Sequence, residues 1–173
     1  MKHLYFIRHG EAEMNVHNLF AGQTDTPLTD KGRAQAQAAG EEAKVLHIDY
    51  IISSPLSRAY DTAKLLAEAT GYPVDKIELS NLLVERSFGS AEGQKWSPDF
   101  DMEAVTDAEP LDDLQARLER FWEYVQTLPA ENILVSSHGS TGRMLRHVVN
   151  PDIPFHGTAL SHHLPNAHIV QFV

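Results

Sequence analysis

The chain has 173 residues, 42% of them hydrophobic, and its 24 acidic and 14 basic side chains give a formal net charge of -10. This length predicts one globular domain with a sizeable core, whereas the negative charge weighs against partners such as nucleic acid or anionic membranes, which need an extended basic face. The chain has no cysteine, which excludes disulfides, thiolate metal ligands and thiol nucleophiles. No apolar run is long enough to span a bilayer and no export leader is visible, so we expect a cytoplasmic location.

The segment Leu4–Ile7 is an apolar run too short for a helix, and it ends abruptly in Arg8, His9 and Gly10. This pattern predicts a buried strand that delivers charged groups to its carboxyl end. In an open α/β sheet ligands bind at that edge, because loops leave the strands there and helix N-termini present free N–H groups. Arg8 offers a planar fork of donors suited to phosphate oxygens, and His9 is the candidate nucleophile. The alternative is a strand end without catalytic function, at which the histidine is hydrogen-bonded within the protein and the arginine reaches solvent.

Residues 13–26 have the composition of a polar loop. An Ala-rich helix should follow and run to about Val45. Thr29 or Asp30 is the candidate N-cap of this helix, because either side chain can accept a hydrogen bond from a free N–H group of the first turn.

Residues 50–54 predict a second buried strand, followed by a helix that runs to about Ala69. Ser54 is the candidate N-cap and Pro55 the candidate first residue of that helix. Arg58 then falls in the first helical turn, the end of the macrodipole that disfavours a cation. A local rule broken in this way indicates function, although an exposed surface arginine is the plain alternative.

A weak strand is expected at residues 76–79, and the apolar run 82–84 then delivers Glu85. A carboxyl group beside an apolar run is partly desolvated, which favours the protonated form that a general acid needs. The alternative is a solvated glutamate beside Arg86. The following residues, at about 86–110, predict a short irregular and helical lid segment.

Between residues 111 and 128 apolar side chains recur at helical spacing, which predicts an amphipathic helix packed on the core. Residues 133–137 form the third clear buried strand, which ends in His138. The predicted helix over 141–149 begins just after this imidazole, so its N-terminus could help to hold an anion. A last strand from about His168 should complete the sheet.

Three strand-to-helix junctions thus bring a cation or an imidazole to one edge of a parallel sheet. The groups are two arginines and two histidines, and helix-terminal amides lie beside them. Together they suit a tetrahedral dianion, and a neighbouring carboxyl group can serve as an acid.

The motifs along the chain resemble those of the histidine phosphatase superfamily, which has the phosphoglycerate-mutase-like fold. They are R-H-G-E-x-x-x-N at 8–15, L-T-x-x-G-x-x-Q at 28–35, S-S-P-L-x-R-A-x-x-T-A at 53–63, L-x-E-x-x-F-G-x-x-E-G at 83–93 and S-H-G-x-x-x-R at 137–143. The resemblance implies an α/β three-layer sandwich, with a mostly parallel central sheet and helices on both faces. It also implies that residues 1–173 form a single histidine-phosphatase domain.

The resemblance implies phosphoryl transfer in two steps. His9 attacks phosphorus while Glu85 protonates the leaving oxygen, and water activated by Glu85 then hydrolyses the phosphohistidine. The equatorial oxygens are held by Arg8, Arg58 and His138. The further predicted phosphate- and substrate-binding residues are Asn15, Ala21, Gly22, Gln23 and Gly139.

No cofactor and no metal are implied, because two guanidinium groups supply the charge neutralisation that a magnesium ion supplies elsewhere. The alternative is a metal site made of the C-terminal histidines. These lack regular ligand spacing, and the only acid near them is Asp152; they are His156, His162, His163 and His168.

The leading prediction is a metal-independent phosphomonoesterase acting on a small phosphorylated metabolite. Members of the family that isomerise phosphoglycerate have a longer insert with an Arg-Arg pair, a tyrosine where this chain has Phe88, and an asparagine where it has Ser140. The alternatives are therefore mutase-type phosphoryl transfer and a phosphoprotein phosphatase. A non-catalytic binding module is disfavoured because nucleophile and acid are both present, and no feature of the sequence indicates an oligomeric state.

Overall fold

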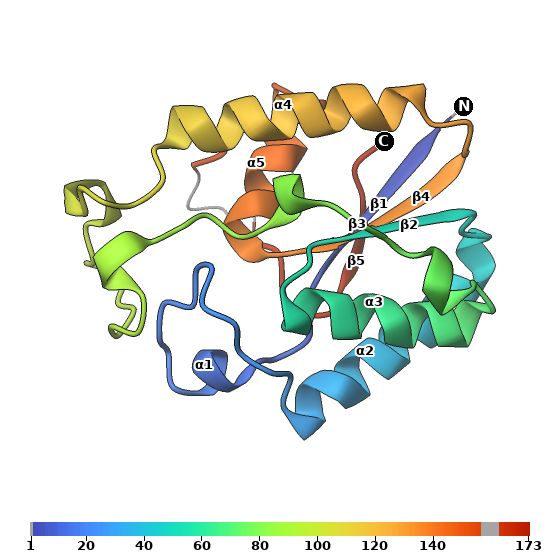
Figure 1. The fold of residues 1–173 in the computed structure, drawn as a ribbon, viewed down its shortest axis with the longest axis horizontal. Helices are drawn as coiled ribbons and strands as arrows, with labels where there is room; N and C mark the ends of the chain where they lie inside the picture. The colour runs from blue at the N-terminus through green and yellow to red at the C-terminus, as the bar shows by residue number, and fades with distance from the viewer. Residues whose placement is uncertain (1, 157–162) are drawn as a thin grey trace.

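The centre of the fold is a five-stranded sheet in this computed structural model, which describes residues 2–156 and 163–173 (Figure 1). The strand order is β3-β2-β4-β1-β5, and only β5 runs antiparallel to its neighbour. The strands are β1 (His3–Arg8), β2 (Tyr50–Ser53), β3 (Glu78–Leu79), β4 (Asn132–Ser137) and β5 (Ile169–Gln171). In the described part of the chain, no helix is both long and apolar enough to cross a bilayer.

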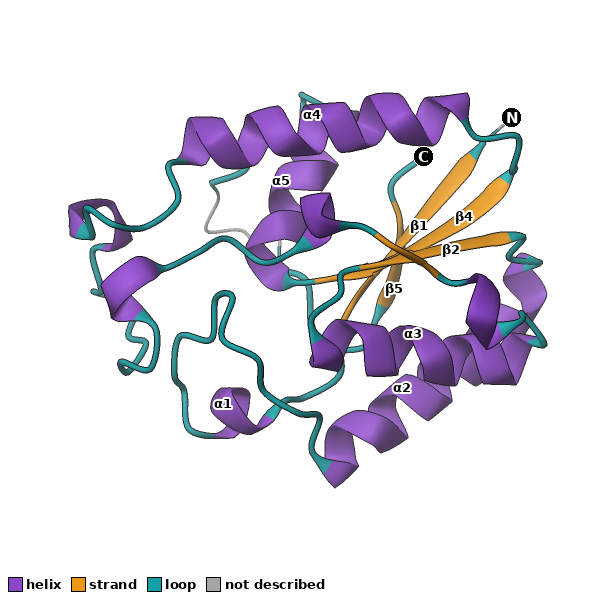
Figure 2. Ribbon diagram, viewed as in Figure 1, coloured by secondary structure: helices purple, strands orange, loops and turns teal. Residues whose placement is uncertain are grey.

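Helices cover both faces of the sheet, which confirms the predicted three-layer α/β architecture (Figure 2). One face carries α2 (Asp30–Ala43) and α3 (Ser57–Thr70), and the other carries α4 (Leu111–Thr127) and α5 (Gly139–Val149). The short elements are α1 (Glu13–Val16) and the 3-10 helices η1 (Lys44–Leu46), η2 (Val74–Lys76), η3 (Asn81–Leu83), η4 (Gly89–Ala91) and η5 (Met102–Ala104).

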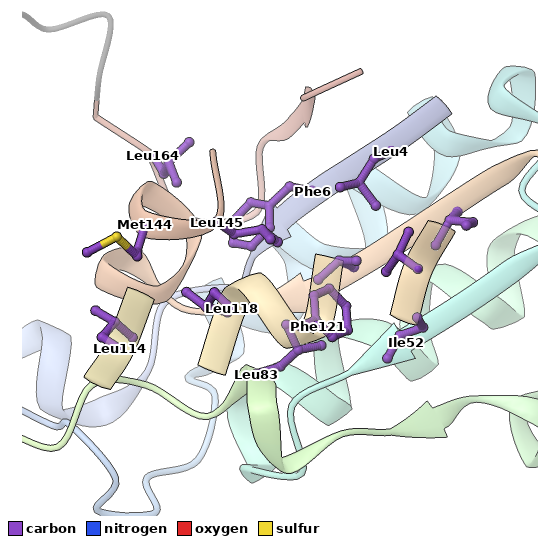
Figure 3. Packing of buried hydrophobic residues seen from close by; sticks show 13 residues of the cluster. Leu4, Phe6, Ile52, Leu83, Leu114, Leu118, Phe121, Met144, Leu145 and Leu164 are labelled. Carbon is purple, nitrogen blue, oxygen red and sulfur yellow. The ribbon is translucent and has the colours of Figure 1, made fainter. Parts of the chain in front are cut away.

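The two faces of the sheet are packed differently. On the α4 and α5 side the core is built from bulky side chains, and Phe6 of β1, Phe121 of α4 and Leu145 of α5 belong to one cluster (Figure 3). On the other side the helices contribute mostly small residues, such as Ala36 and Ala63, so their backbones can lie close to the sheet and to each other. Both layers hold the strands, and hence the strand ends, in fixed positions.

The strand register aligns the carboxyl ends of β1, β2 and β4. Arg8 pairs with Ser137, and Ser53 pairs with Ser136. The chain therefore leaves the three strands at the same edge of the sheet, where His9 and His138 follow directly. This alignment produces the convergence that the sequence predicts.

The predicted strands and long helices are present, but the start of α3 was predicted wrongly. The helix begins at Ser57 instead of Pro55, and Ser54 does not cap it. The backbone N–H and the hydroxyl of Ser57 both donate to Asp25 Oδ1, at 2.9 and 2.7 Å. A carboxylate from a distant loop therefore takes the place of a local N-cap, and Arg58 still lies in the first turn.

Other boundaries also differ from the predictions. The expected loop 13–26 contains α1, at whose start Asn15 Oδ1 accepts the N–H of Ala12. Helix α2 ends at Ala43 and continues as η1, with Thr29 as the N-cap. The remaining differences are that β3 has only two residues, α5 starts two residues early at Gly139, and the 86–110 segment contains η4 and η5.

Candidate active site

A pocket of about 580 Å³ opens at the edge of the sheet where β1, β2 and β4 end. Most of the predicted site residues line it: Arg8, His9, Asn15, Ala21, Gly22, Arg58, Glu85 and Gly139. Two predicted residues do not line the pocket. His138 is fully buried. Gln23 is exposed, and its Nε2 donates to the carbonyl of Glu85 at 3.1 Å. The structure therefore brings the predicted residues together, with Gln23 in a supporting place.

His9 is held as a neutral imidazole. Its Nδ1 lies 2.6 Å from the carbonyl oxygen of Gly10, which can only accept, so Nδ1 carries the proton. Arg58 donates from Nε to the remaining lone pair on Nε2, at 3.3 Å. Burial, and then the positive charges of Arg58 and Arg8, lower the pKa of His9 well below its usual range. Nε2 is therefore the nucleophilic atom.

Gly10 fixes the path of the chain directly after His9. A β-carbon at this position would lie 2.3 Å from the carbonyl oxygen of Gly32 at the start of α2. The Gly10 N–H also donates to Thr62 Oγ1 on α3, at 3.1 Å. The glycine therefore lets β1 leave the sheet in close contact with α2 and α3, and this contact orients His9.

Arg58 is almost fully buried, and its fork of donors is held by a loop. Its Nη2 donates to the carbonyl of Gly22 at 2.6 Å and its Nη1 to that of Thr24 at 2.9 Å. Burial lowers the pKa of Arg58, while Glu85 and Asp25 act in the opposite direction. A guanidinium stays charged in such a site. Arg58 thus presents a fixed positive charge beside His9 Nε2.

Two buried polar atoms beneath the pocket lack hydrogen-bond partners among the residues that the structure describes: Arg8 Nε and His138 Nδ1. His138 Nε2 lies 2.8 Å from Ser54 Oγ, which itself accepts the N–H of Leu56. The Ser54 hydroxyl can therefore donate to Nε2, leaving the imidazole proton on Nδ1. A buried donor without a partner is costly, so both atoms are suited to bind an anionic ligand.

Glu85 is bound at the N-terminus of α5. Its carboxylate accepts the N–H groups of Ser140 at 3.1 Å and Thr141 at 2.9 Å, the Thr141 hydroxyl at 3.0 Å, and the N–H of Arg86 at 2.9 Å. These donors fix the position of the carboxylate at the edge of the pocket.

Glu92, a position of the L-x-E-x-x-F-G-x-x-E-G motif, organises the loop that holds Arg58. Its carboxylate accepts the N–H of Gln23 at 2.9 Å and the hydroxyl of Thr24 at 2.6 Å. Gly22 adopts φ +51°, and a β-carbon there would lie 2.1 Å from Glu92 Oε1. The carboxylate therefore packs directly against the loop whose carbonyls hold Arg58. The position of Glu92 in the motif was the feature of the sequence that could have identified this role.

The outer part of the pocket is aromatic. Phe20 lies at the centre of a cluster, with its ring centroid 5.4 Å from that of Phe88 and 4.7 Å from that of Phe100. Trp96 and Met102, also from the 86–110 segment, complete this wall. These side chains were missed because no regular pattern marks them in an irregular stretch of chain.

Arg143 also lines the outer pocket and was not predicted as a site residue. It lies four positions after Gly139 on α5, so one helical turn places both on the same side of the helix. That spacing in the S-H-G-x-x-x-R motif could have revealed it.

The structure gives no support to the alternative metal site. Across residues 2–156 and 163–173, it places no group of three or more histidine, cysteine, aspartate or glutamate side chains to hold a metal ion. His156 and His163 line the pocket, His168 is exposed beside β5, and His162 lies outside the described residues.

Similar proteins identify the family. The family model for the histidine phosphatase superfamily (branch 1) matches residues 4–173. A 2,3-bisphosphoglycerate-dependent phosphoglycerate mutase 2 of Gloeobacter violaceus is 33% identical over 160 residues, covering 82% of this chain and 73% of the relative.

Two solved structures share the fold across nearly the whole chain. The mycobacterial glucosyl-3-phosphoglycerate phosphatase in complex with VO3 superposes with a TM-score of 0.84 at 27% identity, covering 99% of this chain and 92% of that one. The alpha-ribazole phosphatase of Shigella flexneri gives a TM-score of 0.78 at 26% identity, covering 98% and 89%. Sequence and fold agree, and the chain belongs to branch 1 of the histidine phosphatase superfamily.

Proposed function

We propose that this protein is a metal-independent phosphomonoesterase that acts on a small phosphorylated metabolite through a phosphohistidine at His9. The observation that carries the proposal is the neutral imidazole of His9, whose Nε2 lies beside the fixed charge of Arg58 in the pocket. Two similar structures are named as phosphatases of small phosphorylated molecules, which supports this choice of substrate class.

In the first step, His9 Nε2 attacks phosphorus and forms the N–P bond as the ester P–O bond breaks. The leaving oxygen takes the electron pair of that bond and a proton from Glu85. Arg8 and Arg58, together with His138 Nδ1–H, donate to the equatorial oxygens of the transferring group. Asn15 and the amide of Gly139 complete the phosphate site in this proposal.

In the second step, water attacks phosphorus and gives a proton to the Glu85 carboxylate, and the N–P bond breaks. Inorganic phosphate leaves, His9 is neutral again and Glu85 is again the acid, so atoms and charges balance over the cycle.

A mutase must keep the dephosphorylated product bound until it takes the phosphoryl group back. In this chain Phe88 lacks the hydroxyl of a tyrosine, Ser140 is shorter than an asparagine, and no Arg-Arg pair follows Gly93. We infer that the product leaves quickly and that water is the usual acceptor. The mutase among the sequence relatives keeps this alternative worth testing.

Phosphorus NMR of the purified protein decides between the alternatives. We expect inorganic phosphate to accumulate from small monoesters, and 3-phosphoglycerate with a trace of 2,3-bisphosphoglycerate to give phosphate much faster than 2-phosphoglycerate. Rapid interconversion of the two phosphoglycerates with little free phosphate would instead establish a mutase. A clear preference for phosphopeptides over every small monoester would establish a phosphoprotein phosphatase.

Metal independence belongs to the same proposal, because Arg8 and Arg58 supply fixed positive charge at the phosphate site. The protein should keep its full rate after treatment with a chelator. A rate that is lost on chelation and restored by added magnesium or zinc would contradict this. A cytoplasmic location without nucleic-acid or membrane partners stays a prediction.

A further inference from the structure

Arg143 is a cation in the pocket without an acidic partner. Its Nη2 donates to Ser140 Oγ at 3.3 Å, and its guanidinium lies over the ring of Phe155, 5.2 Å from the centroid. Among the residues that the structure describes, no carboxylate forms an ion pair with it. By contrast Arg86, another arginine of the pocket wall, is paired with Glu103 at 3.3 Å. The charge of Arg143 is therefore available to a ligand.

Arg143 also adds to a concentration of positive charge. Burial lowers the pKa of Arg8; Glu85 opposes that effect, and Arg143 adds to it because the two guanidinium groups repel each other. The carboxylate of Glu85 is already engaged by the amides of α5. Like charges brought together in a pocket are unfavourable until an anion binds, so their presence indicates an anionic ligand, and Arg143 is a cation beyond the two assigned to the phosphate.

The size of the pocket allows such a ligand. Its volume of about 580 Å³ is many times that of a phosphate group, so most of it must accommodate the rest of the substrate. Arg143 lies four residues, about 6 Å along the axis of α5, from Gly139 at the phosphate end. A second anionic group could therefore bind to Arg143 while the phosphate lies at the end of the helix.

We propose that Arg143 is a specificity-determining residue that binds a second anionic group of the substrate, either a carboxylate or a second phosphate. The aromatic side chains of Phe20 and Phe88 then pack against the carbon atoms between the two anionic groups. The proposal rests on the proposed phosphomonoesterase function and narrows its substrate class. It places the specificity-determining residue on α5, the helix whose N-terminus lies at the phosphate site.

Matched substrates test this assignment. The carboxylate pair is 3-phosphoglycerate and glycerol 3-phosphate, and the phosphate pair is fructose 1,6-bisphosphate and fructose 6-phosphate. We expect Arg143→Met to lower kcat/KM at least tenfold for the preferred doubly anionic member, mainly through KM, and less than threefold for its partner. Arg120→Met, which removes an exposed arginine of α4, is the matched control and should change neither value.

The outcomes separate the possible roles of Arg143. Selective loss on one pair identifies the second group as a carboxylate or a phosphate. An equal loss for both members of each pair would overturn the proposal, because Arg143 would then support the phosphate site itself or the packing of Phe155. No loss for any substrate would also overturn it, because Arg143 would then not contact the substrate.

If the protein hydrolyses none of these esters, the binding of the same ligands to the variant His9→Ala still tests the proposal. Calorimetry should show that 3-phosphoglycerate or fructose 1,6-bisphosphate binds at least tenfold more tightly than its singly anionic partner, and that adding Arg143→Met removes the difference. Turnover failing while this preference holds would contradict the proposed function alone. Equal binding of both members of each pair would contradict the role of Arg143.

Discussion

The inner and outer halves of the pocket are built in different ways. The inner half consists of three buried polar groups, His9, Arg58 and His138, and the half-buried Arg8, placed by the ends of aligned strands and the helices that follow them. The outer half consists of aromatic side chains on irregular backbone, and Trp96 on its rim remains 55% exposed. The rigid half is suited to fixed chemistry, whereas the irregular half can select a substrate without changing that chemistry.

The outer half is attached to the rest of the molecule by a partly buried ion pair. Arg117 of α4 donates from Nε to Glu109 Oε1 at 2.7 Å and from Nη2 to Oε2 at 3.0 Å. Arg86 donates to the carbonyl of Glu109 at 2.8 Å. These contacts hold the two ends of the 86–110 segment close to each other and to α4. Backbone hydrogen bonds to Asn18 and Phe20 also tie the middle of this segment to the loop that follows α1.

The largest effects should come from the inner half. Arg58→Ala removes a charge-assisted donor to the transferring group and one contact to His9, so kcat should fall about a thousandfold. Initial rates with a saturating small monoester measure this. A fall of less than about tenfold, roughly 1.4 kcal/mol, would show that Arg58 does not contact the transferring phosphoryl group in the transition state.

Arg58→Lys is the companion variant, because it keeps the charge but loses the planar fork that the carbonyls of Gly22 and Thr24 hold. It should recover only part of the rate. Thermal unfolding of both variants identifies any loss that comes from misfolding.

A smaller effect on kcat should come from Glu92 of the 86–110 segment, which supports the loop that holds Arg58. Glu92→Gln weakens the contacts to Gln23 and Thr24, so the loop that orients Arg58 should relax and kcat should fall about tenfold. Glu123→Gln, at an exposed acid of α4 away from the pocket, is the control. If Glu92 acts through Arg58, the substitution should have almost no further effect in Arg58→Ala. Full additivity would show that Glu92 acts by another route.

The smallest effect concerns stability rather than rate. Burial, followed by nearby positive charges, lowers the pKa of His9 and of His138 well below the usual value near 6.5. The unfolded chain then binds more protons than the folded one, so the free energy of unfolding should decrease as pH falls below about 6.5. Each such histidine contributes a slope of about 1.4 kcal/mol per pH unit. Urea unfolding between pH 7 and pH 5 measures this slope.

His138→Gln should reduce that slope by the contribution of one histidine. A slope unaffected by His138→Gln would mean that this imidazole is protonated in the folded protein.

The difference between the inner and outer halves of the pocket also explains which residues could be predicted from the sequence. Arg8, His9 and His138 follow short apolar runs directly, so the strand pattern alone places them at one edge of the sheet. Arg58 was found because it breaks a helix rule locally. The cap of α3 was assigned wrongly because Asp25 comes from a distant loop, and no local pattern encodes that contact.

The outer half could not be derived in the same way. The roles of Glu92 and Arg143 depend on which loop or ring each side chain meets in the folded chain. Residues 86–110 have no hydrophobic period from which positions can be inferred, so the aromatic wall becomes visible only when the fold brings Phe20 against Phe88 and Phe100.

The most direct test of the account is the identity of the phosphorylated residue. The protein is mixed with a rapidly hydrolysed monoester, quenched in alkali within milliseconds to preserve phosphohistidine, and mapped by mass spectrometry. We predict phosphate on His9 alone, and none in His9→Ala, whose activity should be lost. Phosphate on His138, or continued turnover without any phosphoenzyme in either protein, would contradict the assignment of His9 as the nucleophile.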